Sequence, residues 1–260
     1  MIRTVVCICF FVCLCLCAGC TYQEEPIPIE SEYQELTEES VEDIDVSDKF
    51  FSHTGIENEN DYQEGIFRRG NQDYYNDALF IGDSRTKGLG LYGTLKNADY
   101  FAASGMSLYN ISKEQVSVGE YVNITLEELL KEEEYGKIYL MLGINELGYD
   151  MDKNIKKYEQ LLRDLQIAEP EALIYVCANL HVTKTRHEND PIHNNTNINI
   201  FNERISEFAN GVDVFYLDVN PLFDDEEGNL NVLLASDDSH ILGEYYVNWC
   251  EWLMEHTVAK

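Results

Sequence analysis

The sequence predicts an α/β domain in which helices cover both faces of a parallel sheet. Along the chain, short apolar runs typical of buried strands alternate with segments that carry apolar residues at helical spacing. Apart from Lys137 and Asp213, the strand candidates are apolar, as expected of parallel strands buried on both faces. This pattern begins near Asp77 and continues to the end of the chain.

The first half of this region supplies three strands and two helices. Residues 78–81 form a short apolar strand, and a helix interrupted by glycine follows over residues 86–95. Residues 100–103 are the second strand. Three leucines at helical spacing, Leu126, Leu129 and Leu130, predict a helix over residues 124–135. The third strand is KIYLML, residues 137–142.

The second half repeats the alternation. Apolar residues from Ile155 to Leu165 make one stripe of a helix that begins near Met151 and is stopped by Pro170. A strand, a helix, a strand and a last helix follow in that order, over residues 172–178, 198–209, 212–217 and 242–254. The polar stretch over residues 183–197 contains one proline and is interpreted as a loop.

Charge divides the chain into two parts. The 260 residues include 48 Asp and Glu but only 18 Lys and Arg, and the formal net charge is −30. This balance argues against nucleic-acid binding and against adsorption to an anionic membrane through protein charge. Over residues 21–65, Lys49 is the only basic side chain other than histidine, and apolar residues have no period. We interpret residues 21–75 as an acidic, largely disordered tether before a folded domain over residues 76–260; an acidic subdomain is the alternative.

The first twenty residues have the layout of a secretory signal. One arginine precedes an apolar run of about fifteen residues, which is too short for a comfortable membrane span, and small residues follow. The run ends in Ala18-Gly19-Cys20, which resembles a bacterial lipobox with Cys17 at the usual leucine position. This predicts a lipoprotein signal peptide over residues 1–20, lipidation of Cys20 and an extracytoplasmic protein anchored by lipid. An ordinary cleaved signal, giving a secreted protein, or an uncleaved anchor are the alternatives.

Only two cysteines, Cys177 and Cys250, follow Cys20, and we expect both to be buried thiols. The sequence has no CxxC or HExxH pattern, so we predict no metal site.

Polar residues with catalytic chemistry occur where the predicted strands end. Ser84 follows the first strand, Gly105 the second and Asn145 the third, whereas Asp237 and His240 precede the last helix. Because right-handed crossovers return every strand in the same direction, these residues are expected at one edge of the sheet.

Together these residues provide the parts of an acyl-transfer site. Ser84 can be the nucleophile, His240 its general base, and Asp237 the group that orients the imidazole. The N–H groups of Ser84 and Gly105 and the amide of Asn145 can form an oxyanion hole. Each residue alone has an ordinary interpretation: a helix N-cap for Ser84, a turn for Gly105, a loop residue capping the next helix for Asn145, a solvated loop for Asp237 and a surface position for His240. Their order and placement favour catalysis.

Four segments, FIGDSRTKG, the glycine of AASGMS, LGINE and SDDSH, resemble the conserved blocks of the SGNH (GDSL-type) hydrolase superfamily over residues 77–260. The resemblance implies a three-layer, flavodoxin-like α/β/α sandwich with a central five-stranded parallel sheet. It implies the same catalytic and oxyanion roles and no cofactor. The departures are Arg85 for Leu, Glu146 for Asp and Asp238 for Gly, and none removes a catalytic group.

The family cleaves esters and some thioesters, and the site edge predicted here is polar. We therefore expect a serine esterase for small acyl groups, acetyl in particular, on carbohydrate or cell-wall glycan, with Arg85, Glu146 and Asn194 contacting the substrate. A salt bridge to a nearby carboxylate is the alternative role of Arg85. Alternative functions are a lipid or thioester acylhydrolase, an O-acyltransferase, and, in a different class, a non-catalytic glycan-binding lipoprotein, against which the intact Ser84, Asp237 and His240 argue.

Overall fold

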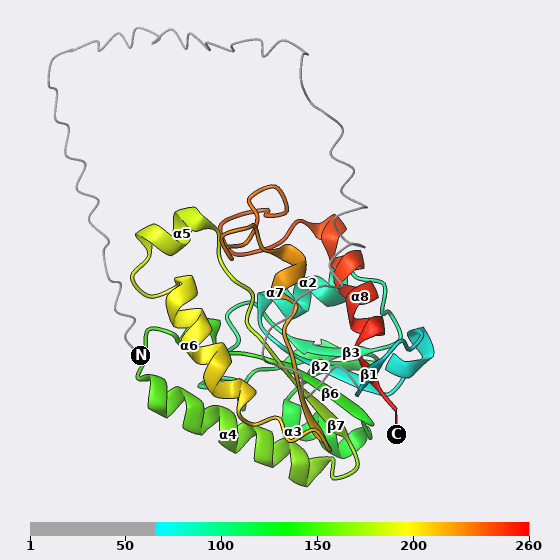
Figure 1. The fold of residues 1–260 in the computed structure, drawn as a ribbon. Helices are drawn as coiled ribbons and strands as arrows, with labels where there is room; N and C mark the ends of the chain where they lie inside the picture. Colours follow the sequence, from blue (N-terminus) through cyan, green and yellow to red (C-terminus); the bar gives the residue numbers. More distant parts are fainter. Residues whose placement is uncertain (1–65, 260) are drawn as a thin grey trace, which may run out of the picture. The chain divides into compact units, whose positions relative to one another are not determined.

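Five parallel strands form the central sheet in the order β3-β2-β6-β7-β8 (Figure 1). The computed structural model describes residues 66–259. In it the strands are β2 (Ala78–Gly82), β3 (Asp99–Ala102), β6 (Lys137–Met141), β7 (Leu173–Cys177) and β8 (Val214–Leu217). All four pairings are parallel, which confirms the predicted sheet.

Helices cover the sheet on both sides, which confirms the three-layer sandwich. Buried residues of α3 (Leu126–Glu132), α4 (Met151–Ala168) and α6 (Asn195–Ser206) share one core cluster with one face of the strands. Buried residues of α2 (Ser84–Tyr92), α7 (Asn220–Phe223) and α8 (Tyr246–Glu255) share a second cluster with the opposite face. Successive strand residues alternate between the two clusters, because side chains of a strand point to opposite faces in turn.

A row of aromatic rings crosses the second face at one register of the sheet. The strand pairings place five rings side by side: Tyr100, Phe80, Tyr139, Tyr175 and Phe215. Neighbouring centroids lie 5.0, 4.4, 4.4 and 5.7 Å apart along this row. Stacked aromatic pairs add to the stabilisation that their buried area provides, so the row joins all five strands beneath α2 and α8.

The order of the strands creates a switch point at β2. The chain passes from β2 to β3 on one side and then crosses to β6 on the other. In open α/β sheets, ligands bind beyond the carboxyl ends of the strands at such a point. Residues 83 and 84, which follow β2 directly, therefore lie where this fold places a binding site.

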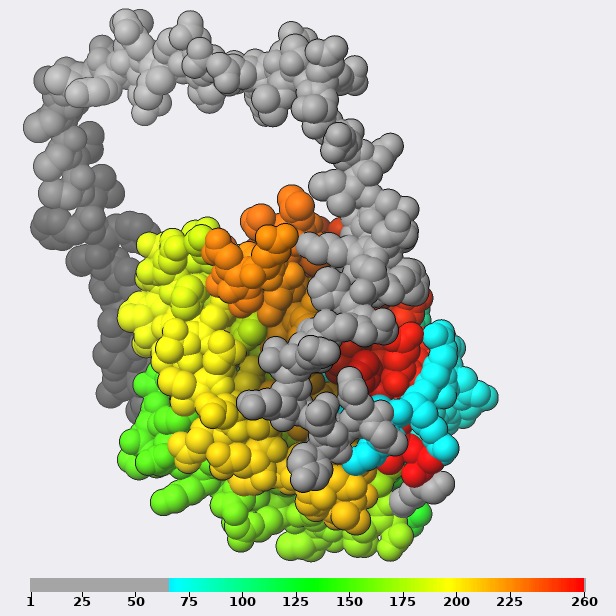
Figure 2. Space-filling model, in the orientation of Figure 1, coloured from blue at the N-terminus to red at the C-terminus, as the bar shows by residue number. Residues whose placement is uncertain are grey.

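The structure corrects the interpretation of residues 183–197 as a loop. This stretch contains α5 (Lys184–Asn189) and the start of α6. Asn195 is buried, and its side chain exchanges hydrogen bonds with both backbone groups of Val182 and donates to Asn229. Figure 2 shows α6, in yellow, in contact with the orange segment that follows α7. Polar side chains in this stretch, such as Asn195, form hydrogen bonds inside the fold, so a polar sequence here does not indicate a loop.

Five smaller features differ from the sequence prediction. The chain also forms a β-hairpin of β4 (Val116–Val118) and β5 (Tyr121–Ile124), the short helix α7, and a 3-10 turn, η3 (Gly243–Tyr245), before α8. Near the start, β1 (Phe67–Arg68) pairs with β9 (Thr257–Val258), and η1 (Gln72–Tyr75) carries the fully buried Tyr75.

The folded domain therefore already includes residues 66–75, which the sequence analysis places in the tether. The predicted signal peptide, Cys20 and the rest of the acidic tether lie outside the described residues. Within residues 66–259, no helix has the length and apolar character needed to cross a membrane.

Candidate active site

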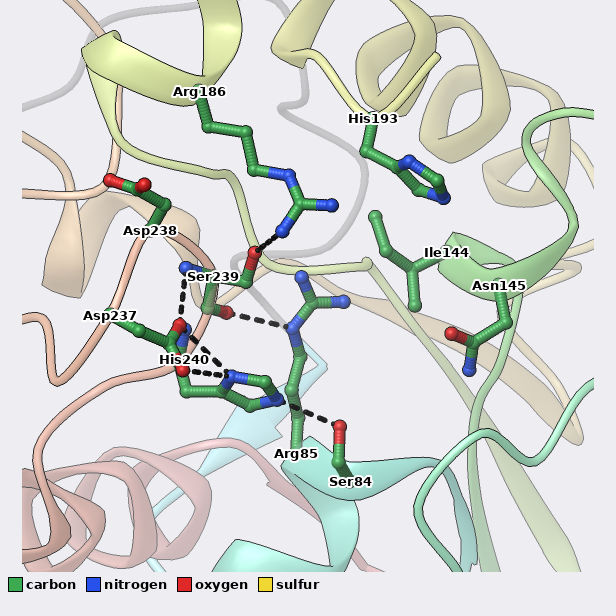
Figure 3. A pocket seen from close by; sticks show the side chains of 10 residues that line it. All are labelled: Ser84, Arg85, Ile144, Asn145, Arg186, His193, Asp237, Asp238, Ser239 and His240. Carbon is green, nitrogen blue, oxygen red and sulfur yellow. Dashed lines mark hydrogen bonds and ion pairs between the residues drawn. The ribbon is translucent and has the colours of Figure 1, made fainter. Parts of the chain in front are cut away.

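Ser84 lies at the first position of α2, immediately beyond the buried strand β2. A Cβ on Gly82 would lie 2.7 Å from the carbonyl oxygen of Met141, so the chain can pass close to β6 only with glycine there. Asp83, not Ser84, is the N-cap, and its Oδ1 accepts from the N–H of Arg85 at 2.9 Å. The Ser84 hydroxyl is thereby released from capping and lies 2.8 Å from Nε2 of His240 (Figure 3).

His240 is held by Asp237 from the same loop. Its Nδ1 lies 2.9 Å from Oδ2 and 3.0 Å from Oδ1 of Asp237. Oδ1 also accepts from the backbone N–H groups of Ser239, at 2.7 Å, and His240, at 2.9 Å. Partial burial acts to raise the pKa of Asp237, but these hydrogen bonds together hold it below its ordinary value. Asp237 is therefore an ionised acceptor that fixes the ring of His240.

Gly105 and Asn145 come from the loops that follow β3 and β6. Gly105 has a φ of +78°, which favours glycine, and its carbonyl accepts from the side chain of Asn110. Asn145 lies in η2 (Ile144–Glu146), and its Nδ2 donates to the carbonyl of Met106 at 2.8 Å. That bond joins the two loops and uses one of the two amide hydrogens, so the second remains available to a ligand.

Glu146 and Asn194 do not line the pocket, which corrects their expected contact with substrate. The Glu146 side chain is fully buried and accepts from the N–H of Leu108, and burial raises its pKa to about 7. Asn194 is the N-cap of α6: its Oδ1 accepts from the N–H of Asn197, and its Nδ2 donates to the carbonyl of Asp190. Both side chains shape the loops around the pocket.

Two roles were expected of Arg85, a contact with substrate and a salt bridge to a carboxylate, and its position is compatible with both. It lines the pocket although its side chain is only 2% exposed, and its Nη1 lies 4.0 Å from Oδ2 of the buried Asp83. Two of the pocket residues, Arg186 of α5 and His193, lie outside the four motif segments and were not predicted from the sequence. The available signal was the presence of Arg186 and three histidines between residues 181 and 193 of a strongly acidic chain.

These residues surround a pocket of about 300 Å³ (Figure 3). Ten residues line it: Ser84, Arg85, Ile144, Asn145, Arg186, His193, Asp237, Asp238, Ser239 and His240. Of these ten, Ile144 alone has an apolar side chain. Among the described residues, no three His, Cys, Asp or Glu side chains gather where they could hold a metal ion.

Comparison with known proteins connects this arrangement to a family. The model of the GDSL-like Lipase/Acylhydrolase family matches residues 80–246. A solved structure from Streptococcus pneumonia named for platelet activating factor superposes with a TM-score of 0.54 and 20% identity, covering 70% of this chain and 88% of that one. A GDSL-like lipase from Bacteroides thetaiotaomicron superposes with a TM-score of 0.52 and 16% sequence identity, covering 72% of this chain and 88% of that one. At sequence identities of 20% and 16%, the similarity to these two structures shows a shared fold alone. No curated protein matches the chain.

Proposed function

This chain belongs to the GDSL-like lipase/acylhydrolase family, and from that premise we propose that it hydrolyses small acyl esters through an acyl-enzyme on Ser84. The observation that carries this proposal is the continuous hydrogen-bonded chain from Ser84 through His240 to Asp237 at the wall of a pocket. A serine hydroxyl alone is a weak nucleophile, and an adjacent base that is itself held in place activates it.

In the first half-reaction, Ser84 Oγ attacks the ester carbonyl carbon while Nε2 of His240 takes the hydroxyl proton. Asp237 stabilises the imidazolium that forms. The tetrahedral intermediate then collapses: the carbon–oxygen bond to the alcohol breaks, and His240 returns the proton to the departing oxygen. In the second half-reaction, water replaces the serine hydroxyl as nucleophile. The products are a carboxylic acid, the alcohol and free Ser84.

Three hydrogen-bond donors can stabilise the negative charge that develops on the carbonyl oxygen. They are the backbone N–H groups of Ser84 and Gly105 and the second amide hydrogen of Asn145. Each such donor, when aimed at the developing charge, contributes about 3 to 4 kcal/mol to transition-state stabilisation. The bond from Asn145 to Met106 supports this role, because it keeps the amide and the Gly105 loop together before substrate binds.

The size and lining of the pocket favour a short acyl group on a polar alcohol. A volume of about 300 Å³ lies at the small end of ligand pockets. Each methylene needs an apolar wall to gain about 0.8 kcal/mol, and Ile144 is the one apolar side chain among the ten lining residues. Acetyl esters of carbohydrate or cell-wall glycan fit these limits. Lipidation at Cys20 would hold the enzyme on the membrane outside the cytoplasm, where such glycans occur.

An assay with 4-nitrophenyl esters of two, four and eight carbons tests the proposal. We expect kcat/KM to be highest for acetate and to fall from about four carbons upward, because longer chains gain no apolar contact. Ser84→Ala should reduce turnover by about a thousandfold or more. Ser104→Ala, an exposed serine on the neighbouring loop, is the matched control and should stay near the wild-type rate. A preference for octanoate would refute the substrate assignment, and an active Ser84→Ala protein would refute the nucleophile.

A further inference from the structure

The guanidinium of Arg85 is buried and incompletely paired. Its Nε donates to the carbonyl of Ser239 at 3.2 Å, but among the described residues its Nη1 has no hydrogen-bond partner. The Asp83 carboxylate is 4.0 Å away, beyond hydrogen-bonding distance. Figure 3 shows the end of this side chain rising from beside Ser84 into the pocket. A buried charge with an unsatisfied donor costs folding free energy, so its retention needs an explanation.

A second guanidinium approaches from the opposite wall. Arg186 of α5 points down into the pocket, and its Nη1 donates to the hydroxyl of Ser239 at 2.6 Å (Figure 3). Its Nη2 lies 3.3 Å from Asp190, and its Nε is buried without a partner among the described residues. Ser239 therefore holds both arginines, one through its carbonyl and one through its hydroxyl. Burial, and to a smaller extent the repulsion from Arg186, lower the pKa of Arg85.

Each guanidinium has one carboxylate beside it, Asp83 at 4.0 Å from Arg85 and Asp190 at 3.3 Å from Arg186, and the other carboxylates of the pocket are bound to other groups. Asp237 holds His240, and Asp190 accepts from His193 and pairs with Arg186. Asp238 accepts from the hydroxyl of Thr183 at 2.7 Å, and Figure 3 shows its carboxylate turned away from the space between the two guanidinium groups. Both guanidinium groups therefore converge on the cavity, each with one carboxylate nearby and one N–H group without a hydrogen-bond partner among the described residues.

We propose that the alcohol part of the substrate carries an anionic group, a carboxylate, sulfate or phosphate, and that Arg85 and Arg186 bind it. This inference rests on the proposed esterase function and narrows the substrate to an acylated acidic glycan. The site lies on the alcohol side for a geometric reason. His240 must return its proton to the departing oxygen, and Ser239, which anchors both arginines, is the residue next to it.

Guanidinium groups suit this task, since their planar N–H donors match the oxygens of a carboxylate, sulfate or phosphate. A neutral sugar in the same place would leave Nη1 of Arg85 without a strong acceptor. Sites built around a polar substrate group discriminate against analogues that lack it. We therefore expect a preference for the anionic substrate of about tenfold or more, the range of one charge-assisted hydrogen bond.

A matched pair of esters tests this preference on the full-length protein. O-acetylated methyl galacturonoside and O-acetylated methyl galactoside differ only in a carboxylate against a hydroxymethyl group. Wild-type kcat/KM should favour the first by about tenfold or more. In Arg186→Gln the ratio of the two values should fall towards one. Arg163→Gln, on the exposed surface of α4, is the control and should keep the wild-type ratio. A wild-type ratio near one, or an unchanged ratio in Arg186→Gln, would overturn the inference.

Binding to the Ser84→Ala protein separates this inference from the esterase proposal. Calorimetry should detect galacturonate but not galactose, and Arg186→Gln in the same background should abolish the galacturonate signal. If the wild type hydrolyses neither ester while this binding persists, the esterase proposal fails and the anion site stands. If both esters are hydrolysed equally and galacturonate does not bind, the anion site fails and the esterase proposal stands.

Discussion

Glu146 is next in the chain to Asn145, one of the donors of the proposed oxyanion hole. Its carboxyl is fully buried and accepts from the N–H of Leu108, on the loop that carries Gly105. Its backbone carbonyl accepts from the buried side chain of Asn154 in α4. Glu146 thereby connects the loop of Asn145 to the loop of Gly105 and to α4, and burial raises its pKa to about 7.

This raised pKa makes Glu146 a source of pH-dependent stability. The folded state keeps its proton up to about pH 7, whereas the unfolded chain releases it near about 4.3. The stability from this group is therefore present below the unfolded pKa and is lost as pH rises through the folded one. Glu146→Gln mimics the protonated form. Relative to wild type, it should gain about 2 kcal/mol in the free energy of unfolding between pH 5 and pH 7.5.

Denaturant unfolding of both proteins at the two pH values measures this difference. Glu251→Gln, an exposed glutamate of α8, is the matched control and should follow the wild type at both values. A constant difference between Glu146→Gln and wild type would show that Glu146 is already ionised at pH 5.

The sequence predicts those site residues that lie directly after a strand of the sheet. Ser84, Gly105 and Asn145 each follow a strand, and a parallel sheet brings such ends together. Asp237 and His240 share one loop, three residues apart. Arg186 and His193 could not be found this way, because their approach to the pocket depends on how residues 183–197 fold back onto it. The burial of Glu146 likewise depends on its contacts with other loops.

At the scale of elements, the row of rings across the sheet makes a testable contribution to stability. Tyr139 occupies its centre, 4.4 Å from the ring centroids of both Phe80 and Tyr175. Tyr139→Ala removes two stacked contacts and leaves a cavity, so it should lower the free energy of unfolding by about 3 to 5 kcal/mol. Tyr139→Phe keeps the ring and should cost much less.

Thermal and denaturant unfolding would compare these variants with Tyr149→Ala. Tyr149 is 61% exposed, although it too contacts another ring, that of Tyr109. Its loss should cost less than about 1 kcal/mol. If Tyr139→Ala and Tyr149→Ala lowered the free energy of unfolding equally, the row of rings would have no special contribution to stability.

The elements that sequence could predict are those with a local signal. The five central strands are apolar runs, and their predicted bounds differ from the observed ones by at most two residues at either end. β1 and β9 are two residues each and form only because distant segments of the chain pair. In α5 and the start of α6, order depends on buried asparagines such as Asn195 and on the cap at Thr183. Such tertiary hydrogen bonds leave no periodic pattern in sequence.

At the scale of the whole molecule, the charge and the first twenty residues suggest how the enzyme is held in place. We expect a lipid on Cys20 to anchor the chain, because a formal net charge of −30 does not favour binding to an anionic membrane through protein charge. A pair of acyl chains binds a membrane stably, whereas a single chain binds only marginally. Cys20→Ser should therefore move the protein from the membrane fraction to the soluble fraction.

Fractionation of cells that express the full chain tests this expectation by immunoblot. Cys13→Ser changes a cysteine in the same apolar run and is the matched control, which should remain with the membrane. Membrane association that survives Cys20→Ser would instead indicate an uncleaved helix.

The proposed mechanism requires that Ser84 carries the acyl group during turnover. Acid quenching of the wild-type protein within the first turnover of an acetyl ester, followed by peptide mass spectrometry, measures this directly. We expect one added acetyl group on the peptide that contains Ser84, and its absence from the Ser84→Ala protein. An acetyl group on another residue, or hydrolysis that proceeds with no acylated peptide at all, would contradict this mechanism.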